Sequence, residues 1–208
     1  YPKKLLRYCL VVPFLGLFIS CKQNTFDTEQ DLWAYIKDEA NGYTYQKKVG
    51  NVLYSLTYRP TDVLVKQELG ENLSQDKVSS LRSKYQEYIY FNLSMSANNQ
   101  ELLNTQAGDR NAFGAMVNEL AFGMADKVHL YTQSKDTIPM VDYIYPRMYG
   151  MSGSTNLLLI YPRDKELLSQ EFFHFSVEDL GFRTGEIRFK LPTKPFKSEP
   201  MLKLKTEI

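Results

Sequence analysis

The sequence predicts a mainly β fold of the α+β class: an immunoglobulin-like antiparallel β-sandwich with an N-terminal helix, a hairpin and helical insertions. Two observations support this class. The chain of 208 residues holds 15 tyrosines and 12 phenylalanines, and aromatic side chains favour strands. From Asp126 onward, short strand-forming runs alternate with turn residues at a spacing that is typical of an antiparallel sandwich.

The first elements of the predicted domain are a helix and a β-hairpin. Thr28 and Asp31 approximate a capping box, which favours a helix start at this point. Gly50 and Asn51 form a turn pair between two runs of alternating polarity, which favours a tight hairpin. The expected elements are a helix over residues 28–40 and strands over residues 43–49 and 52–58.

The remaining elements follow from periodicity and from turn signals. Apolar residues alternate with polar ones around Phe91, which is the clearest period-two pattern in the chain. Phe113, Met116, Val117 and Leu120 share one helical face. The expected helices cover residues 62–69, 74–85 and 109–122, and the expected strands cover residues 89–95, 127–132, 138–145, 157–161, 171–177, 186–191 and 201–205. Residues 192–200 are expected to be flexible.

The chain is predicted to have three parts: a leader over residues 1–20, a short structureless tether over residues 21–27, and a single globular domain over residues 28–208. A sub-boundary is possible near residue 85. A domain of this size buries a core without disulfides or metals to hold it together. No long low-complexity linker divides it.

The leader has a basic start and a short apolar run. Lys3, Lys4 and Arg7 precede the 12 mainly apolar residues 8–19. A helix of that length spans about 18 Å, which is less than the ~30 Å core of a bilayer. This argues against a membrane-spanning anchor and favours a signal peptide. The other alternative is a buried core helix.

The residues at the end of the leader are Phe18, Ile19, Ser20 and Cys21. They resemble the lipobox of bacterial lipoproteins, although Phe18 and Ile19 depart from its usual residues. The resemblance covers only the leader. It implies that Cys21 becomes the first residue, is acylated, and anchors the protein in a lipid bilayer essentially permanently. Lys22 replaces the aspartate that retains such proteins at the inner membrane, so the implied location is the cell envelope at the outer membrane, on a face left undecided.

The charge balance excludes one class of partner. Without Lys3, Lys4 and Arg7, 22 of the 25 Lys and Arg residues remain, against 24 Asp and Glu residues. No basic excess is present to neutralise phosphates, so nucleic acid is not an expected partner. Cys9 leaves with the leader, so Cys21 has no partner for an internal disulfide.

No motif in the chain predicts a catalytic residue, a metal ligand or a cofactor. The two histidines, His129 and His174, lack neighbours at metal-ligand spacing. The glycines and serines of residues 150–154 do not match a nucleophile elbow, because Ser154 replaces its second glycine. His174 alternates with phenylalanines, which places it on the wetter face of its strand.

A tetrapeptide repeat predicts a binding surface. Ile144-Tyr145-Pro146-Arg147 recurs as Ile160-Tyr161-Pro162-Arg163. The copies lie at opposite ends of the sandwich if their strands are antiparallel neighbours, and they come together if the strands change sheets. Tyrosine and arginine hold carboxylates and sugar faces well, and the loop between the copies suits recognition. The predicted binding residues, with both arginines expected to be exposed, are Tyr145, Arg147, Tyr149, Ser152, Asn156, Tyr161 and Arg163.

These expectations describe a membrane-anchored lipoprotein that acts as a binding or assembly module of the cell envelope. Its expected partners are the lipid bilayer, through acylated Cys21, and an envelope protein or glycan. The alternative is a cell-envelope hydrolase whose active site is assembled from residues far apart in the chain, a kind of site that one sequence does not reveal.

Overall fold

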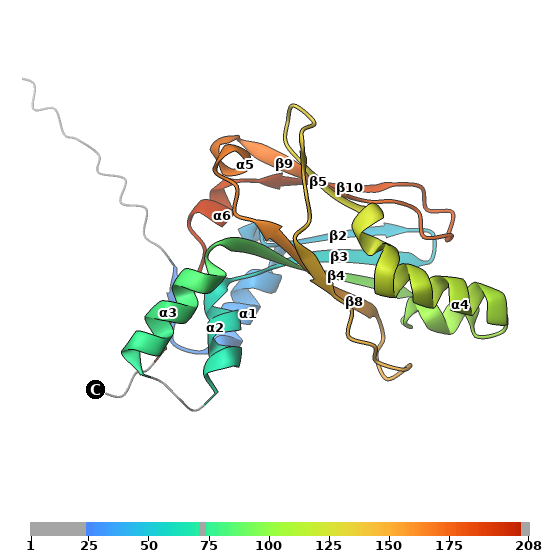
Figure 1. The fold of residues 1–208 in the computed structure, drawn as a ribbon, viewed down its shortest axis with the longest axis horizontal. Helices are drawn as coiled ribbons and strands as arrows, with labels where there is room; N and C mark the ends of the chain where they lie inside the picture. Colours follow the sequence, from blue (N-terminus) through green and yellow to red (C-terminus); the bar gives the residue numbers. More distant parts are fainter. Residues whose placement is uncertain (1–23, 71–73, 205–208) are drawn as a thin grey trace, which may run out of the picture.

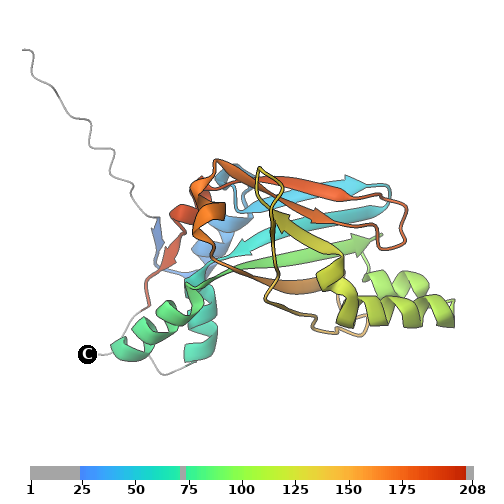
Figure 2. The same ribbon diagram turned by 45° about the horizontal axis from the view of Figure 1, so that its top comes forward.

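The computed structural model describes residues 24–70 and 74–204. Two mainly antiparallel sheets pack on each other, with helices at the ends (Figures 1 and 2). This confirms the mixed, mainly β class and a sandwich-like arrangement. The immunoglobulin-like part of the prediction is not confirmed, because β2, β3 and β4 lie side by side, whereas the third strand of that fold crosses to the other sheet.

The larger sheet has five strands in the order β2 (Thr44–Val49), β3 (Val52–Arg59), β4 (Tyr88–Ala97), β8 (Thr155–Pro162) and β7 (Asp142–Ile144). The smaller sheet has four strands in the order β10 (Ile187–Pro192), β9 (Phe172–Val177), β5 (Val128–Tyr131) and β6 (Thr137–Ile138). Because β3 and β4 are hydrogen-bonded neighbours, the chain segments before and after Tyr85 share one sheet.

Helices α1, α2 and α3 gather at one end of the molecule, and α4 lies toward the other end (Figure 1). The α-helices are α1 (Glu29–Lys37), α2 (Thr61–Leu69), α3 (Gln75–Tyr85), α4 (Arg110–Asn118), α5 (Lys165–Ser169) and α6 (Lys194–Lys197). Shorter turns are η1 (Glu39–Asn41), η2 (Leu102–Gln106), the π-helical turn η3 (Glu119–Gly123) and η4 (Met124–Asp126). No helix in residues 24–70 and 74–204 is long and apolar enough to cross a membrane.

Strand alternation separates the core from the outer faces. Every second residue of β3, from Val52 to Tyr58, is buried between the sheets, and the residues between them are partly exposed. Phe91 and Phe175 meet across the core, with ring centroids 6.0 Å apart. The outer face of the five-stranded sheet is therefore a half-exposed surface of side chains.

Two local predictions are confirmed in detail. The Thr28 hydroxyl accepts a hydrogen bond from the Asp31 N–H and caps α1. Val49 pairs with Val52 across the hairpin turn, where Gly50 has a φ of +58°. That left-handed conformation favours glycine, so the hairpin has the turn residue that it needs.

Other predictions are wrong. The stretch expected to be structureless before residue 28 contains β1 (Thr25–Phe26), which pairs in parallel with β11 (Met201–Leu202). The stretch expected to be flexible contains α6, whose Phe196 is buried. The strand expected over residues 138–145 is two strands: β6 ends in the smaller sheet, and β7 begins in the larger one after Pro139. The leader and Cys21 lie outside the described residues.

Candidate binding surfaces

The two copies of the tetrapeptide repeat run toward opposite ends of the β7–β8 pair. Strands β7 and β8 are antiparallel neighbours, in which Asp142 pairs with Ile160 and Ile144 pairs with Leu158. From this pairing, the first copy continues toward the start of β8 at Thr155, whereas the second copy continues to the end of β8 at Pro162. The seven predicted binding residues therefore do not form one surface, and Tyr161 and Arg163 are separated from the other five.

Arg163 is part of a largely buried network rather than an exposed patch. Its Nη2 donates to the Tyr58 hydroxyl at 3.1 Å, and its Nη1 donates to the Phe196 carbonyl at 3.1 Å. Glu199 forms an ion pair with it at 3.5 Å (Nη2 to Oε1). The ring of Tyr161 is completely buried. The expectation that Arg163 is exposed and available to a partner is wrong, because it has partners inside the protein.

Glu199 connects this network to α2. Its carboxylate accepts hydrogen bonds from the Thr61 N–H at 3.1 Å and the Thr61 hydroxyl at 3.0 Å, and it is also bonded to the Tyr58 hydroxyl. Thr61 is the first residue of α2, and a carboxylate at a helix N-terminus is electrostatically favourable. Burial raises the pKa of Tyr58 well above its ordinary value, and the charge of Glu199 adds to this. The network connects β3, the end of β8, the start of α2 and the segment before β11.

The loop between β7 and β8 is held by a buried carboxylate. Oε1 of Glu101, a buried residue, accepts hydrogen bonds from the Gly150 N–H at 3.0 Å and the Ser152 N–H at 3.1 Å. The Ser96 hydroxyl donates to the Gly153 carbonyl at 2.6 Å. Three backbone groups of the loop, at Gly150, Ser152 and Gly153, are therefore bonded to the body of the protein.

The same loop exposes aromatic, cationic and thioether side chains. Tyr149 is 75% exposed. Its backbone φ is +54°, a conformation that residues other than glycine rarely adopt. The Arg147 guanidinium lies 5.1 Å from the centroid of the Tyr149 ring, and Met151 is 80% exposed. Ser152, one of the predicted binding residues, is bonded within the loop: its hydroxyl accepts a hydrogen bond from the Ser154 N–H.

Five of the six large apolar side chains that are exposed in the described residues lie between positions 141 and 151. Val141 lies beside Ile160, toward the other end of β8, and Ile144 ends β7, so the loop itself carries Met148, Tyr149 and Met151 together with Arg147. We call these four loop residues the tip surface. Tyr145, just before them, is partly buried and packs against the core. Exposed apolar groups that cluster in this way mark interaction surfaces more often than scattered ones do.

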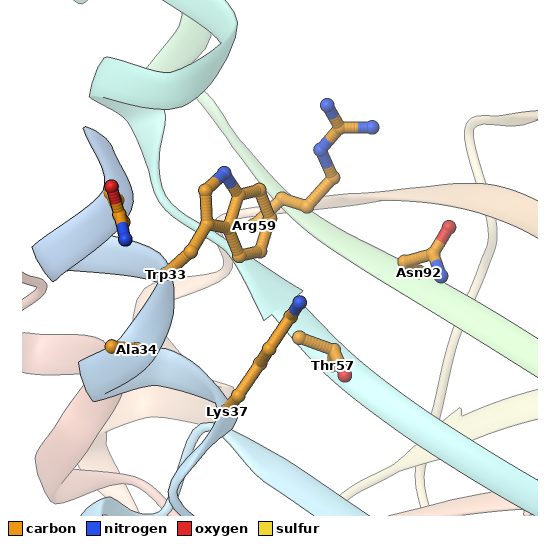
Figure 3. A pocket seen from close by; sticks show the side chains of 7 residues that line it. Trp33, Ala34, Lys37, Thr57, Arg59 and Asn92 are labelled. Atoms are coloured by element: carbon orange, nitrogen blue, oxygen red, sulfur yellow. The ribbon is translucent and has the colours of Figure 1, made fainter.

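A second candidate site is a cavity of about 690 Å³ between α1 and the outer face of the five-stranded sheet. Figure 3 shows Lys37 reaching from α1 toward Thr57, with Arg59 and Asn92 on the two neighbouring strands. The size is within the ~300–1,000 Å³ range of ligand pockets. We call this the α1 cavity; its lining residues are Gln30, Trp33, Ala34, Lys37, Thr57, Arg59 and Asn92.

The polar groups around the α1 cavity are arranged by Glu29. The Trp33 indole N–H donates to Glu29 Oε1 at 3.2 Å, and Lys66 pairs with Glu29 Oε2 at 2.9 Å. The hydrogen bond from Lys66 is the main reason that the pKa of Glu29 lies below its ordinary value. Arg59 donates through Nη2 to Gln67 at 3.0 Å. Burial lowers the pKa of Arg59, so a nearby anion would stabilise its charge.

The α1 cavity was not predicted from the sequence, although one predicted binding residue, Asn156, is bonded to a residue that lines it. Asn92 donates through Nδ2 to Asn156 Oδ1 at 3.5 Å. Asn156 is on β8, beside the tip-surface loop. The side chains of Asn92 and Asn156 thus share the outer face of the sheet. The one sequence signal for the cavity is Trp33, the single tryptophan of the chain, on a helix whose apolar face is formed by Leu32 and Ile36.

The two histidines lie on the outer face of the four-stranded sheet. His129 is 3.0 Å from Glu178 (Nε2 to Oε1), and the His174 ring stacks on Tyr131 with centroids 5.1 Å apart. His174 is half-exposed, as its alternation with buried phenylalanines predicts. Within residues 24–70 and 74–204, no group of three or more His, Cys, Asp or Glu side chains is placed to hold a metal ion.

Comparisons with known proteins give little information on this chain. No family model matches it, and no curated protein matches it. One solved structure that is similar is the crystal structure of a protein of unknown function from Burkholderia pseudomallei, with 10% sequence identity over 79% of this chain and 84% of that chain, and a TM-score of 0.40. The function of this protein must therefore be inferred from its own residues.

Proposed function

We propose that this protein is a lipid-anchored binding or assembly module of the bacterial cell envelope that binds a protein partner through the tip surface. The observation that carries the proposal is that the loop which exposes this surface is hydrogen-bonded to the body of the protein. Buried Glu101 fixes the loop backbone at Gly150 and Ser152, while Tyr149 and Met151 remain largely exposed. A loop that is already ordered loses little entropy when it binds.

The composition of the tip surface supports a protein partner. Tyrosine, methionine and arginine are enriched in protein interfaces, and lysine and glutamate are depleted there. The tip surface has Tyr149, Arg147 and two methionines on one short segment. Truncation of a central side chain in such a surface costs about 2 kcal/mol or more of binding free energy.

The anchor and the tip surface have compatible positions in this proposal. The described chain begins beside β1, at the end formed by α1, α2 and α3, whereas the β7–β8 loop lies toward α4 (Figures 1 and 2). The three-residue step from Cys21 to Asn24 spans at most about 11 Å. An acylated Cys21 would therefore place the α1–α3 end near the bilayer and leave the tip surface accessible to an envelope partner.

Site-specific photocross-linking in the native cells tests the partner proposal. A photoreactive amino acid at position 148 or 151 should form a discrete protein adduct, because both side chains lie in the tip surface. The same amino acid at position 47, an exposed position on the edge strand β2, is the matched control. Tyr149→Ala should reduce the adduct at least tenfold if it removes about 2 kcal/mol of binding. Equal labelling from positions 47 and 151 would contradict the proposal.

A further inference from the structure

We infer that the α1 cavity binds an acidic saccharide, that is, a sugar ring that carries a carboxylate. The cavity combines one aromatic ring, two cations and several uncharged polar groups. Each of these matches one part of such a ligand. This inference rests on the cavity alone and does not depend on the tip surface.

The aromatic component is Trp33. Its N–H is already bonded to Glu29, which fixes the ring and leaves its surface, rather than its polar edge, for a ligand. The ring lines the cavity without being fully buried. Large aromatic rings provide apolar contact area at low entropic cost, and the C–H face of a pyranose ring is a suitable apolar partner for them.

The charged component is the pair Lys37 and Arg59. Among the described residues that line the cavity, these are the charged ones, so the lining is positive. The nearby acid, Glu29, is already paired with Lys66. Arg59 gives one hydrogen bond to Gln67, and its buried Nε has no partner among the described residues. A carboxylate beside either cation would form charge-assisted hydrogen bonds with it.

The uncharged polar component is on both walls of the cavity. Thr57 and Asn92 are direct neighbours across β3 and β4, and Gln30 is on α1. An amide and a hydroxyl can each both donate and accept. This dual capacity suits sugar hydroxyl groups, which also do both.

Two other ligand classes fit less well. An extended peptide is usually bound by backbone pairing with an edge strand, but β3 and β4 are both interior strands with neighbours on each side, so the floor of the cavity offers side chains only. A phosphate is favoured by a free helix N-terminus. The Asp31 N–H at the N-terminus of α1 is already bonded to the Thr28 hydroxyl, and an inorganic phosphate has no C–H face to contact the Trp33 ring.

Fluorescence of the single tryptophan reports directly on this cavity. The purified protein would be titrated with a disaccharide of glucuronic acid and, in parallel, with the carboxyl-reduced neutral disaccharide of the same linkage. The acidic sugar should change the Trp33 emission in a saturable way, and the neutral sugar should bind at least tenfold more weakly, since a hydrogen bond to a charged group contributes about 1.5–3 kcal/mol.

Variants separate the inference from nonspecific charge effects. Lys37→Ala changes an exposed side chain and should weaken binding of the acidic sugar about tenfold, with Arg59→Gln as the second variant. Lys48→Ala is the matched control, because Lys48 is an exposed lysine on the neighbouring strand β2 and does not line the cavity. Absence of saturable binding, equal binding of the neutral sugar, an equal loss in Lys48→Ala, or tighter binding of a short peptide with a free carboxyl terminus would each overturn the inference.

Discussion

Arg163 and Glu199 form an ion pair, 3.5 Å apart (Nη2 to Oε1), between the end of β8 and the segment that leads into β11. A second ionic contact holds the same segment: Asp62 accepts hydrogen bonds from Arg82 at 2.7 Å and from the Leu202 N–H at 2.8 Å. In the described structure, β11 is the sheet partner of β1. The first strand of the described domain is therefore held in place by the segment near the end of the chain.

The two arginines of the repeat provide a matched pair of variants. Arg163→Ala should lower the free energy of unfolding by about 3 kcal/mol, because it removes the guanidinium that pairs with the largely buried carboxylate of Glu199. Arg147→Ala should change it by less than about 0.5 kcal/mol, because Arg147 is on the surface. Urea denaturation of both variants measures the difference. Equal stability of the two variants would show that the buried ion pair does not stabilise the fold.

Glu101 should control the order of the tip-surface loop. In Glu101→Ala, the Gly150 and Ser152 amides lose their acceptor, so we expect faster hydrogen exchange at these two amides and a loss of about 1–3 kcal/mol of stability. Cross-linking from position 151 should also decrease, because the loop must be ordered upon binding. Glu166→Ala, at an exposed glutamate of α5, is the control. Unchanged exchange at Gly150 would mean that the carboxylate does not hold the loop.

The parts of the fold that were predictable depend on neighbours in the sequence. The hairpin around Gly50 was predicted because its turn residues and the alternation of β3 lie within a few residues of each other. The α1 cap was predicted because Thr28 and Asp31 are three positions apart. Such signals are local, and later packing reinforced them in this protein.

The parts that were not predictable depend on contacts between distant segments. Strands β1 and β11 have two residues each, which is too short for a periodic pattern. Arg163 was expected to be exposed because arginine usually is, but Tyr58, Phe196 and Glu199, which come from distant segments, bind its guanidinium inside the protein. Lining residues of the α1 cavity such as Trp33 and Asn92 come from a helix and a strand that only the fold brings together.

The lipid anchor is tested by metabolic labelling. Cells given an alkyne-modified palmitate should label the wild-type protein, and Cys21→Ala should remove the label and release the protein from the membrane fraction, since two or three acyl chains hold a protein on a bilayer essentially permanently. Ser20→Ala is the control, because alanine is also a small residue at the cleavage position. A wild-type protein that takes up no label would contradict the lipoprotein proposal.

Buried tyrosines should make this protein sensitive to alkaline pH. Burial raises the pKa of Tyr43, Tyr58 and Tyr161 above the ordinary value, and it raises the pKa of Tyr45 and Tyr90 to about 12. In the unfolded chain these phenols ionise near pH 10. Between pH 10 and the folded-state pKa, the folded protein thus binds more protons than the unfolded chain. The contribution of these phenols to the free energy of unfolding is therefore fully present below about pH 10. Between that pH and the folded-state pKa, the free energy of unfolding falls by about 1.4 kcal/mol per pH unit for each such tyrosine.

Tyr161→Phe isolates one of these groups. The Tyr161 hydroxyl is buried and has no hydrogen-bond partner among residues 24–70 and 74–204, so its removal should leave the stability at neutral pH unchanged or raise it by about 1–2 kcal/mol. The pKa of Tyr161 is raised by burial alone. Above pH 10, the free energy of unfolding of the variant should therefore fall less steeply than that of the wild type, by about 1.4 kcal/mol per pH unit. Urea denaturation of wild type and variant at several values above pH 10 measures both effects, and phenolate absorbance follows the ionisation. Identical slopes for the two proteins would mean that Tyr161 ionises in the folded state as readily as in the unfolded chain.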